Sequence, residues 1–212
     1  MFLPSERIIS DEFSGLAVAL NSRASHIGIV YRDEAEEVVM LHLAFHHQLR
    51  RNELPHGYCW VNIAGIDERT KEIALAFLEL VGLHSEVPYS FDMTGITFNR
   101  TTGRIQGGEN GEGLTCASFI VAVLAEIGID LIDLSDWPID REVDLEFHRM
   151  VVEMLREMDA NDHADRVSSQ RNFKRMMPLE VGVAAGLPGH PHSHRDIAEI
   201  VSQAASEFAT AA

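Results

Sequence analysis

The 212-residue chain has few of the residues that build several common sites and anchors. Its two cysteines, Cys59 and Cys116, are too few for a disulfide framework and lack zinc-site spacing, so a reducing compartment is the simplest interpretation. Basic residues are also scarce: 17 Lys and Arg stand against 33 Asp and Glu, giving a net charge of −16 at pH 7. This balance argues against nucleic acid or a bare anionic membrane surface as a partner.

Long apolar runs are absent as well. None approaches the ~20 residues needed to cross a bilayer. The first residues also lack a basic region followed by an apolar core, the pattern of a secretory signal peptide. We therefore expect a cytoplasmic protein without stable membrane insertion, while export by a signal-independent route stays open.

The residues that are present indicate an α+β domain. Apolar residues make up 46% and charged residues 24%, an ordinary globular balance. Short β-branched runs predict strands over 25–31, 38–46 and 58–63, with a shorter element of uncertain type at 13–21. Helical spacing predicts helices over 67–83, 116–127, 141–158 and about 195–208. The first two strands should form an antiparallel hairpin, and the small sheet should pack on the helix that begins at Cys116.

The C-terminal quarter has a different composition. We expect one main domain over residues 1–158, which carries the candidate catalytic residues. A polar linker over 159–172 and a helical tail to residue 212 should follow it. The last helix carries Ile197, Ile200, Val201 and Ala204 on one face. That face could pack on the domain itself or on a second subunit, so a homo-oligomer formed through the tail is one expectation.

Cys116 is the first candidate for chemistry. It follows a Gly-rich loop and should lie in the first turn of a helix. Unpaired N–H groups and the positive end of the helix dipole stabilise a thiolate at such a position, so we expect a lowered thiol pKa. A cysteine at a helix start is nevertheless more often a small buried residue than a nucleophile.

Two histidines could supply a base and its partner. His26 and Gly28 share a face of the first strand, and the glycine leaves space that a substrate or the cysteine helix could fill. His42 lies on the second strand, where the right register would place it beside His26. The hypothesis is that Cys116 is the nucleophile, His26 the base and His42 the group that orients His26. His46 shares the face of His42 and is the alternative third member.

This order of residues resembles a known family. The run Ser25-His26-Ile27-Gly28-Ile29-Val30, followed much later by Leu114-Thr115-Cys116-Ala117-Ser118-Phe119, is similar to the circularly permuted NlpC-like group of papain-fold enzymes. In that group the histidine strand precedes the cysteine helix. The group includes bacterial YiiX-like proteins and, more distantly, lecithin retinol acyltransferase-like enzymes. The resemblance covers about residues 20–135.

The resemblance implies a permuted papain-like fold and cysteine-dependent hydrolysis of an amide through a thioester acyl-enzyme, on cell-wall or other small peptides. It also implies that Tyr89, in the loop before the cysteine helix, helps to hold the oxyanion together with the Cys116 amide. A lipid acyltransferase or thioesterase with the same chemistry is the alternative. The acyltransferase-like enzymes have an Asn-Cys-Glu-His-Phe pattern, and the departure here argues against their lipid substrates. A binding module without turnover is a further alternative.

The other cysteine and the histidines near the C-terminus are expected to have structural roles. Cys59 lies in an apolar strand and is expected to be structural. The histidines at 190, 192 and 194 alternate in a Pro/Gly loop without a carboxylate or cysteine partner, so we expect the start of the last helix rather than a metal site. We expect no cofactor and no metal, and a peptide or small acyl compound as the substrate.

Overall fold

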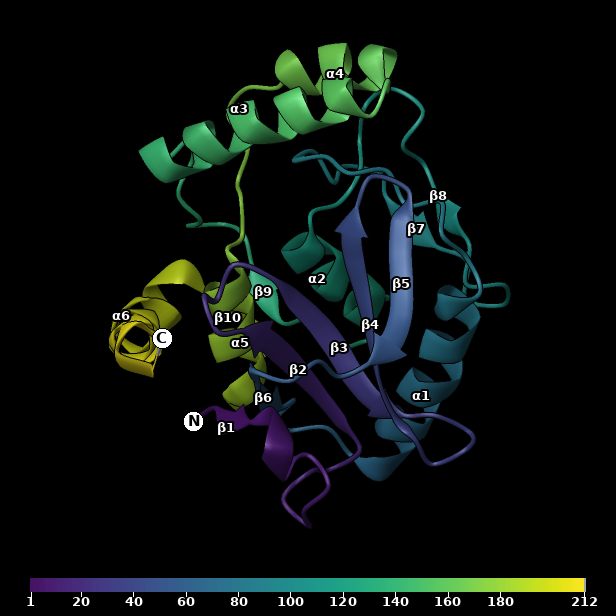
Figure 1. Cartoon of the computed structure of the whole chain (residues 1–212), viewed down its shortest axis with the longest axis vertical. Helices are drawn as coiled ribbons and strands as arrows, with labels where there is room; N and C mark the ends of the chain where they lie inside the picture. The colour runs from purple at the N-terminus through teal and green to yellow at the C-terminus, as the bar shows by residue number, and fades with distance from the viewer. Residues whose placement is uncertain (212) are drawn as a thin grey trace.

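Apolar, β-branched segments in the first 62 residues pair into one antiparallel sheet in a computed structural model that describes residues 1–211 (Figure 1). The strand order is β1-β6-β2-β3-β4-β5. The strands are β1 (Leu3–Pro4), β2 (Leu16–Asn21), β3 (Ile27–Arg32), β4 (Val38–Phe45), β5 (Gln48–Glu53) and β6 (Tyr58–Asn62). The expected hairpin is confirmed as β3 and β4, and the uncertain element at 13–21 contains strand β2.

The sheet is apolar on both faces because its central strands carry large side chains at successive positions. Ile27, Ile29 and Tyr31 of β3 point into the main core. Val30, between them, joins Met40 in a second, smaller cluster on the opposite face. A 3-10 turn over Ser5–Arg7 lies near this second face, and Ile8 and Phe13 from the N-terminal segment pack there.

Three helices cover the main face of the sheet. They are α1 (Glu68–Gly82), α2 (Cys116–Glu126) and α5 (Pro178–Gly186). Helix α1 begins at a side-chain cap, in which Asp67 accepts a hydrogen bond from the Thr70 amide, and α2 is followed by Gly128 at a φ of 84°. Helix α2 packs on β3 and β4, and α5 packs on β2 and β6. These contacts form one apolar core, as the spacing of the sequence predicts for α1 and α2.

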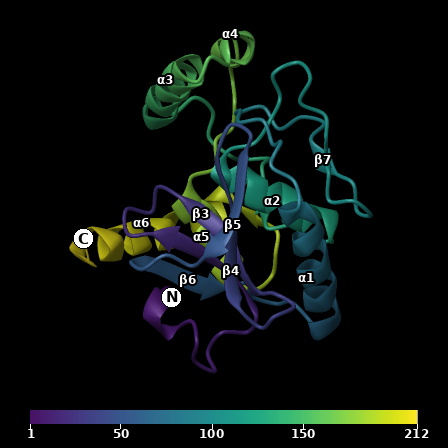
Figure 2. The same ribbon diagram turned by 45° about the vertical axis from the view of Figure 1, so that its right-hand side comes forward.

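Helices α3 (Glu142–Glu157) and α4 (Asn161–Ser168) form a hairpin that stands away from the sheet (Figure 2). Asp159, at a φ of 60°, makes the tight turn between them. The stretch 159–172, expected to be a polar linker, therefore contains an eight-residue helix, Asn161–Ser168. Helix α4 buries only Ala164 and Val167 among polar residues, which is too sparse an apolar pattern to predict from sequence.

Helix α5 is part of the core rather than of an appended tail. Its residues 178–185 are all buried in the same apolar core as the sheet. Gly182 permits this contact, since a Cβ there would lie 2.7 Å from the Leu20 side chain and 3.2 Å from the Phe2 ring. The backbone N–H of Ala64 also donates to the carbonyl of Ala185 at 2.8 Å.

Helix α6 (His194–Ala211) packs on α5 with Ile197 and Ala204 buried. The apolar face expected on this helix thus docks on the chain's own core. Phe208 meets Phe2 edge to face at 5.3 Å, which places the two ends of the chain side by side (Figure 1). Two short ladders complete the fold: β7 (Thr97–Phe98) with β8 (Ile105–Gln106), and β9 (Ile132–Asp133) with β10 (His192–Ser193).

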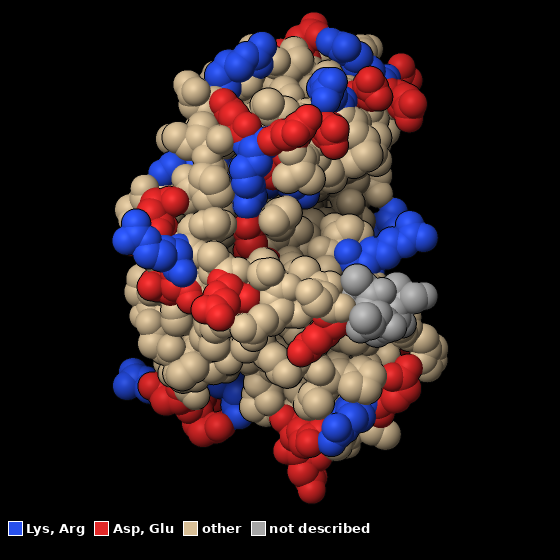
Figure 3. All heavy atoms as spheres, turned by 90° about the vertical axis from the view of Figure 1, so that its left-hand side faces the viewer, with Lys and Arg blue, Asp and Glu red and all other residues tan. Residues whose placement is uncertain are grey.

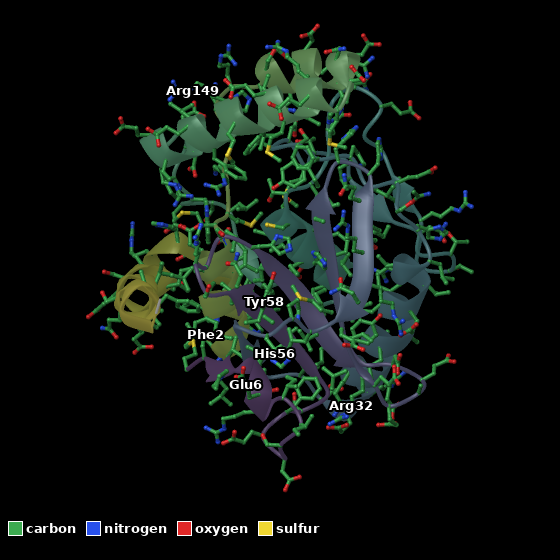
Figure 4. The ribbon with its side chains drawn as sticks, viewed as in Figure 1. Phe2, Glu6, Arg32, His56, Tyr58 and Arg149 are labelled. Atoms are coloured by element: carbon green, nitrogen blue, oxygen red, sulfur yellow. The ribbon has the colours of Figure 1, made fainter. Side chains whose placement is uncertain are left out.

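Acidic and basic side chains are interspersed over the surface. On the face drawn in Figure 3, the described basic side chains form no continuous patch. Arg149 points outward from α3, away from the sheet (Figure 4). Across residues 1–211, no helix combines the length and the apolar character required to cross a bilayer.

Candidate active site

Cys116 is the first residue of α2, as the sequence predicts. The helix starts there because Thr115 and Ser118 cap it reciprocally. The Thr115 hydroxyl accepts from the Ser118 amide at 3.2 Å, and the Ser118 hydroxyl accepts from the Thr115 amide at 2.7 Å. The cap fixes the position of the thiol at the start of the helix, where the side chain is 5% exposed.

The pKa of the Cys116 thiol is raised above the ordinary value, contrary to the expectation from its helix-start position. Complete burial is the largest cause. It outweighs four groups that lower the pKa: the backbone N–H groups of Ile27 and Ala117, the charge of Arg175 and the hydroxyl of Tyr89. The resting group is therefore a neutral thiol surrounded by donors that would stabilise a thiolate.

His26 and His42 contact each other, as the register of the hairpin was expected to allow. Nε2 of His26 lies 2.7 Å from Nδ1 of His42, and the rings meet edge to face at 4.8 Å. Ile29 pairs with Leu41, so Gly28 falls opposite His42 in the ladder. Because Gly28 has no side chain, the His42 ring can lean across it towards His26.

The space above Gly28 is not open to a substrate, which corrects the sequence-based expectation. A Cβ on Gly28 would lie 2.8 Å from Cγ of Met40 and 2.9 Å from Cβ of His42. Helix α2 packs on the other face of β3, against Ile27 and Ile29. The glycine thus permits the contact between the two histidines and leaves no room for a ligand.

Asn52 extends the histidine pair, and sequence reasoning missed it. Its Oδ1 lies 2.9 Å from Nε2 of His42, and its Nδ2 donates to the Glu53 carbonyl at 2.8 Å. It lies on β5, a polar strand that the sequence pattern did not predict. A tight turn at His46 and His47, with His47 at a φ of 53°, folds β5 back onto β4, and these two residues carry no turn signature that sequence reasoning could have used.

The hydrogen bonds of Asn52 determine which ring nitrogens carry protons. Since its Nδ2 donates to a carbonyl, its Oδ1 must accept, and His42 must therefore carry a proton on Nε2. Nδ1 of His42 is then an acceptor, so His26 donates from Nε2. This leaves an unprotonated Nδ1 on His26, the state that a general base requires.

Both histidines are neutral at neutral pH. Burial, followed by the charge of His42, lowers the pKa of His26 to about 4. Burial also lowers the pKa of His42. No hydrogen bond joins the His26 ring to the Cys116 thiol among the described residues; the backbone N–H of Ile27, the next residue, is the largest of the influences that lower the thiol pKa.

Tyr89 lies in the buried loop before α2 and reaches the same thiol. Its ring packs on Phe45 with centroids 4.8 Å apart, and its hydroxyl lowers the pKa of the Cys116 thiol. Burial, followed by the charge of Cys116, raises the pKa of Tyr89 well above its ordinary value, so the hydroxyl keeps its proton. Tyr58 on β6, near the centre of Figure 4, also has its pKa raised by burial and then by Cys116.

The remaining candidates lie elsewhere. His46 accepts from the Tyr89 amide and does not contact His26, so the geometry favours His42 as the third member. Cys59 is half-buried on β6, paired with Leu20, and its pKa is raised by burial.

The three histidines of the C-terminal loop make contacts within the chain. His190 and His192 bond the carbonyls of Ala64 and Leu187 at 3.1 and 3.2 Å. His194 is the first residue of α6, as expected, and lies 3.6 Å from Glu180. Within the part of the chain that the structure describes, no cluster of three or more His, Cys, Asp or Glu side chains could hold a metal.

Comparison with protein-family models, curated proteins and solved structures found no match for this chain.

Proposed function

We propose that this protein is a cysteine-dependent hydrolase of the amidase or peptidase type, with Cys116 as nucleophile, His26 as base and His42 as the residue that orients the base. The observation that carries the proposal is the hydrogen-bonded chain from Asn52 through His42 to His26. The chain leaves one acceptor nitrogen on His26, and the backbone N–H of the next residue, Ile27, lowers the pKa of the Cys116 thiol.

The proposed reaction requires the His26 ring, which makes no hydrogen bond to the thiol in this structure, to approach it; Nδ1 of His26 then takes the thiol proton as Sγ of Cys116 attacks the substrate carbonyl carbon. The backbone N–H of Cys116 and the hydroxyl of Tyr89 stabilise the negative oxygen that forms. His26 then protonates the departing amine, leaving a thioester on Cys116. Water, deprotonated by His26, attacks this thioester and releases the carboxylic acid together with the restored thiol.

The proposed reaction starts from a neutral thiol and a neutral imidazole rather than from a thiolate-imidazolium pair. Proton transfer must accompany the attack, because burial disfavours a standing thiolate. Arg175 and Tyr89 lower the thiol pKa against that burial. They therefore assist the formation of the negative charge when it is needed.

The order of elements supports a permuted papain-like fold, in which the histidine strand β3 precedes the cysteine helix α2 on an antiparallel sheet. Small peptides, including those of cell walls, are the substrate class that this resemblance suggests. The proposal extends to a covalent acyl-enzyme intermediate and requires no metal or cofactor.

A second candidate, an acyltransferase or thioesterase, is favoured by an exposed apolar stripe on α3. Val143, Met150, Met154 and Met158 are all more than a third exposed, and helical spacing puts them on one face with Phe147. The Arg175 guanidinium stacks on the Phe147 ring at 3.9 Å, and the same guanidinium acts on the thiol. The stripe thus adjoins the Arg175 guanidinium through Phe147 and would suit an acyl chain.

The test uses p-nitrophenyl acetate as the first probe, followed by peptide-amide and acyl-ester libraries. Cys116→Ala should abolish turnover, whereas Cys59→Ala, the matched control, should retain it. Intact-protein mass spectrometry of the wild type should detect the added acyl mass, and peptide mapping after digestion should place it on the peptide that contains Cys116. Turnover that survives Cys116→Ala would refute the proposal, and a binding module would give no turnover with any member of the libraries.

A further inference from the structure

Two histidines hold the peptide unit of Tyr89 from opposite sides. The backbone N–H of Tyr89 donates to Nδ1 of His46 at 3.1 Å, and Nε2 of His163 donates to the Tyr89 carbonyl at 2.8 Å. His46 follows the last residue of β4, while His163 lies on α4, more than a hundred residues later in the chain. The two rings stack with centroids 4.4 Å apart and planes 27° from parallel.

The loop itself explains why side chains are needed there. The Ser90 amide donates to the Leu114 carbonyl, and the Leu114 amide donates to the Pro88 carbonyl. Residues 88 and 90 thus direct their polar backbone groups to the segment that leads into α2. Tyr89, between them, directs its N–H and C=O the other way, where the two imidazoles satisfy them. The contacts fix Tyr89 relative to a residue two positions before Cys116.

Each ring must be in one tautomer for this arrangement to hold. His46 accepts at Nδ1 and so carries its proton on Nε2, while His163 donates from Nε2. Burial, with contributions from His47 and His163, lowers the pKa of His46 to about 3. Burial lowers the pKa of His163 as well, and the charges of His47 and Arg166 act in the same direction. His46 and His163 line an open pocket at the surface, and the carboxylate residues Glu86 and Glu109 line the same pocket.

We infer that His46 and His163 are positioning residues that set the Tyr89 hydroxyl against Cys116. This inference rests on the proposed function. Tyr89 is held at its peptide by the two histidines and along its ring by Phe45, so the position of its hydroxyl follows from these contacts. A displacement of about 1 Å at an oxyanion donor is enough to impair catalysis. Helix α4 thereby takes part in the active site without touching a substrate.

The primary variant is His163→Ala, which removes the donor to the Tyr89 carbonyl. We expect kcat on p-nitrophenyl acetate to fall about tenfold with KM little changed, because the lost contact acts on the transition state. His163→Gln keeps an N–H donor and should restore most of the activity. His47→Ala is the matched control, since its ring lies 3.9 Å from His46 and makes no bond to Tyr89.

A double-mutant cycle separates positioning from general destabilisation. In a Tyr89→Phe background the hydroxyl is absent, so His163→Ala should cause no further loss of kcat. An equal loss in both backgrounds, or activity unchanged by His163→Ala, would overturn the inference. If His163→Ala fails to fold by circular dichroism, His46→Leu, which removes the acceptor for the Tyr89 amide, is measured in the same cycle with the same expected coupling.

The outcome also distinguishes this inference from the proposed function. Loss of turnover in Cys116→Ala with no coupling between His163 and Tyr89 refutes the positioning role alone. Turnover that survives Cys116→Ala refutes the proposed function itself.

Discussion

Replacing Asn52 with leucine tests which ring nitrogens of His42 and His26 carry protons. The substitution removes the acceptor for the Nε2 proton of His42, which lies 2.9 Å from Oδ1. Without it, His42 can move its proton to Nδ1 and donate to His26. His26 would then carry its proton on Nδ1, where it cannot accept one from the thiol.

The size of the effect follows from what holds the tautomer. A single neutral hydrogen bond contributes about 0.5–1.5 kcal/mol net. Because about 1.4 kcal/mol is tenfold in population, kcat/KM should fall roughly two- to tenfold, far less than the ~10⁴-fold known when a charged orienting group is lost. Asn52 is exposed, so the free energy of unfolding should change by no more than ~0.5 kcal/mol.

The assay pairs p-nitrophenyl acetate kinetics with ¹⁵N NMR of the histidine rings, which reports the tautomers directly. Asn52→Asp keeps an acceptor and should retain activity. Glu53→Leu places the same leucine at the next exposed position of β5 and serves as the control. Unchanged kinetics and unchanged ring tautomers in Asn52→Leu would refute the reasoning.

Three further outcomes follow from the structure. Burial lowers the pKa of His26 from its ordinary 6.5 to about 4, so the ring stays unprotonated until the pH falls through about 4. The profile of kcat/KM from pH 3.5 to 9 should therefore show no loss of activity near pH 6.5. Circular dichroism over the same range reports acid unfolding separately. Gly28→Ala should push His42 from His26, because the added Cβ would lie 2.9 Å from that of His42; we expect about 1–3 kcal/mol of lost stability in urea together with reduced kcat, and full activity would contradict the packing. Asp144→Ala leaves the partly buried guanidiniums of Arg141 and Arg175 without their shared carboxylate, although Arg141 keeps Glu180, and should cost about 1–3 kcal/mol in urea unfolding; an unchanged free energy of unfolding would show that the pairs contribute little.

The hairpin, the cysteine helix and the main core helices could be predicted from the sequence because their signals are local. Short runs of β-branched and other apolar residues mark β3 and β4, and Thr115 caps α2 through Ser118, three residues away. The contact between His26 and His42 followed from strand pairing alone. Such features depend on residues that are close in the chain or one strand apart.

The parts that escaped prediction depend on distant contacts. Strand β5 is polar, and only its hairpin with β4 reveals that Asn52 meets His42. The direction of the Cys116 pKa depends on burial by the whole fold, which outweighs the helix-start effect. Helix α4 buries two residues and still brings His163 to Tyr89, a contact without any sequence pattern.

The place of α5 in the core has a consequence for how the protein is made. The last strand of the six-stranded sheet ends at Asn62. The helix that covers β2 and β6, α5, ends only at Gly186 and is therefore synthesised much later. At ~5–20 residues per second, translation needs about 6–25 s to bridge that interval. During this time the apolar surface of β2 is bare on the ribosome, where a chaperone or an edge of another nascent chain can reach it. Expression level and temperature should therefore affect the yield of folded protein more than its final stability would suggest.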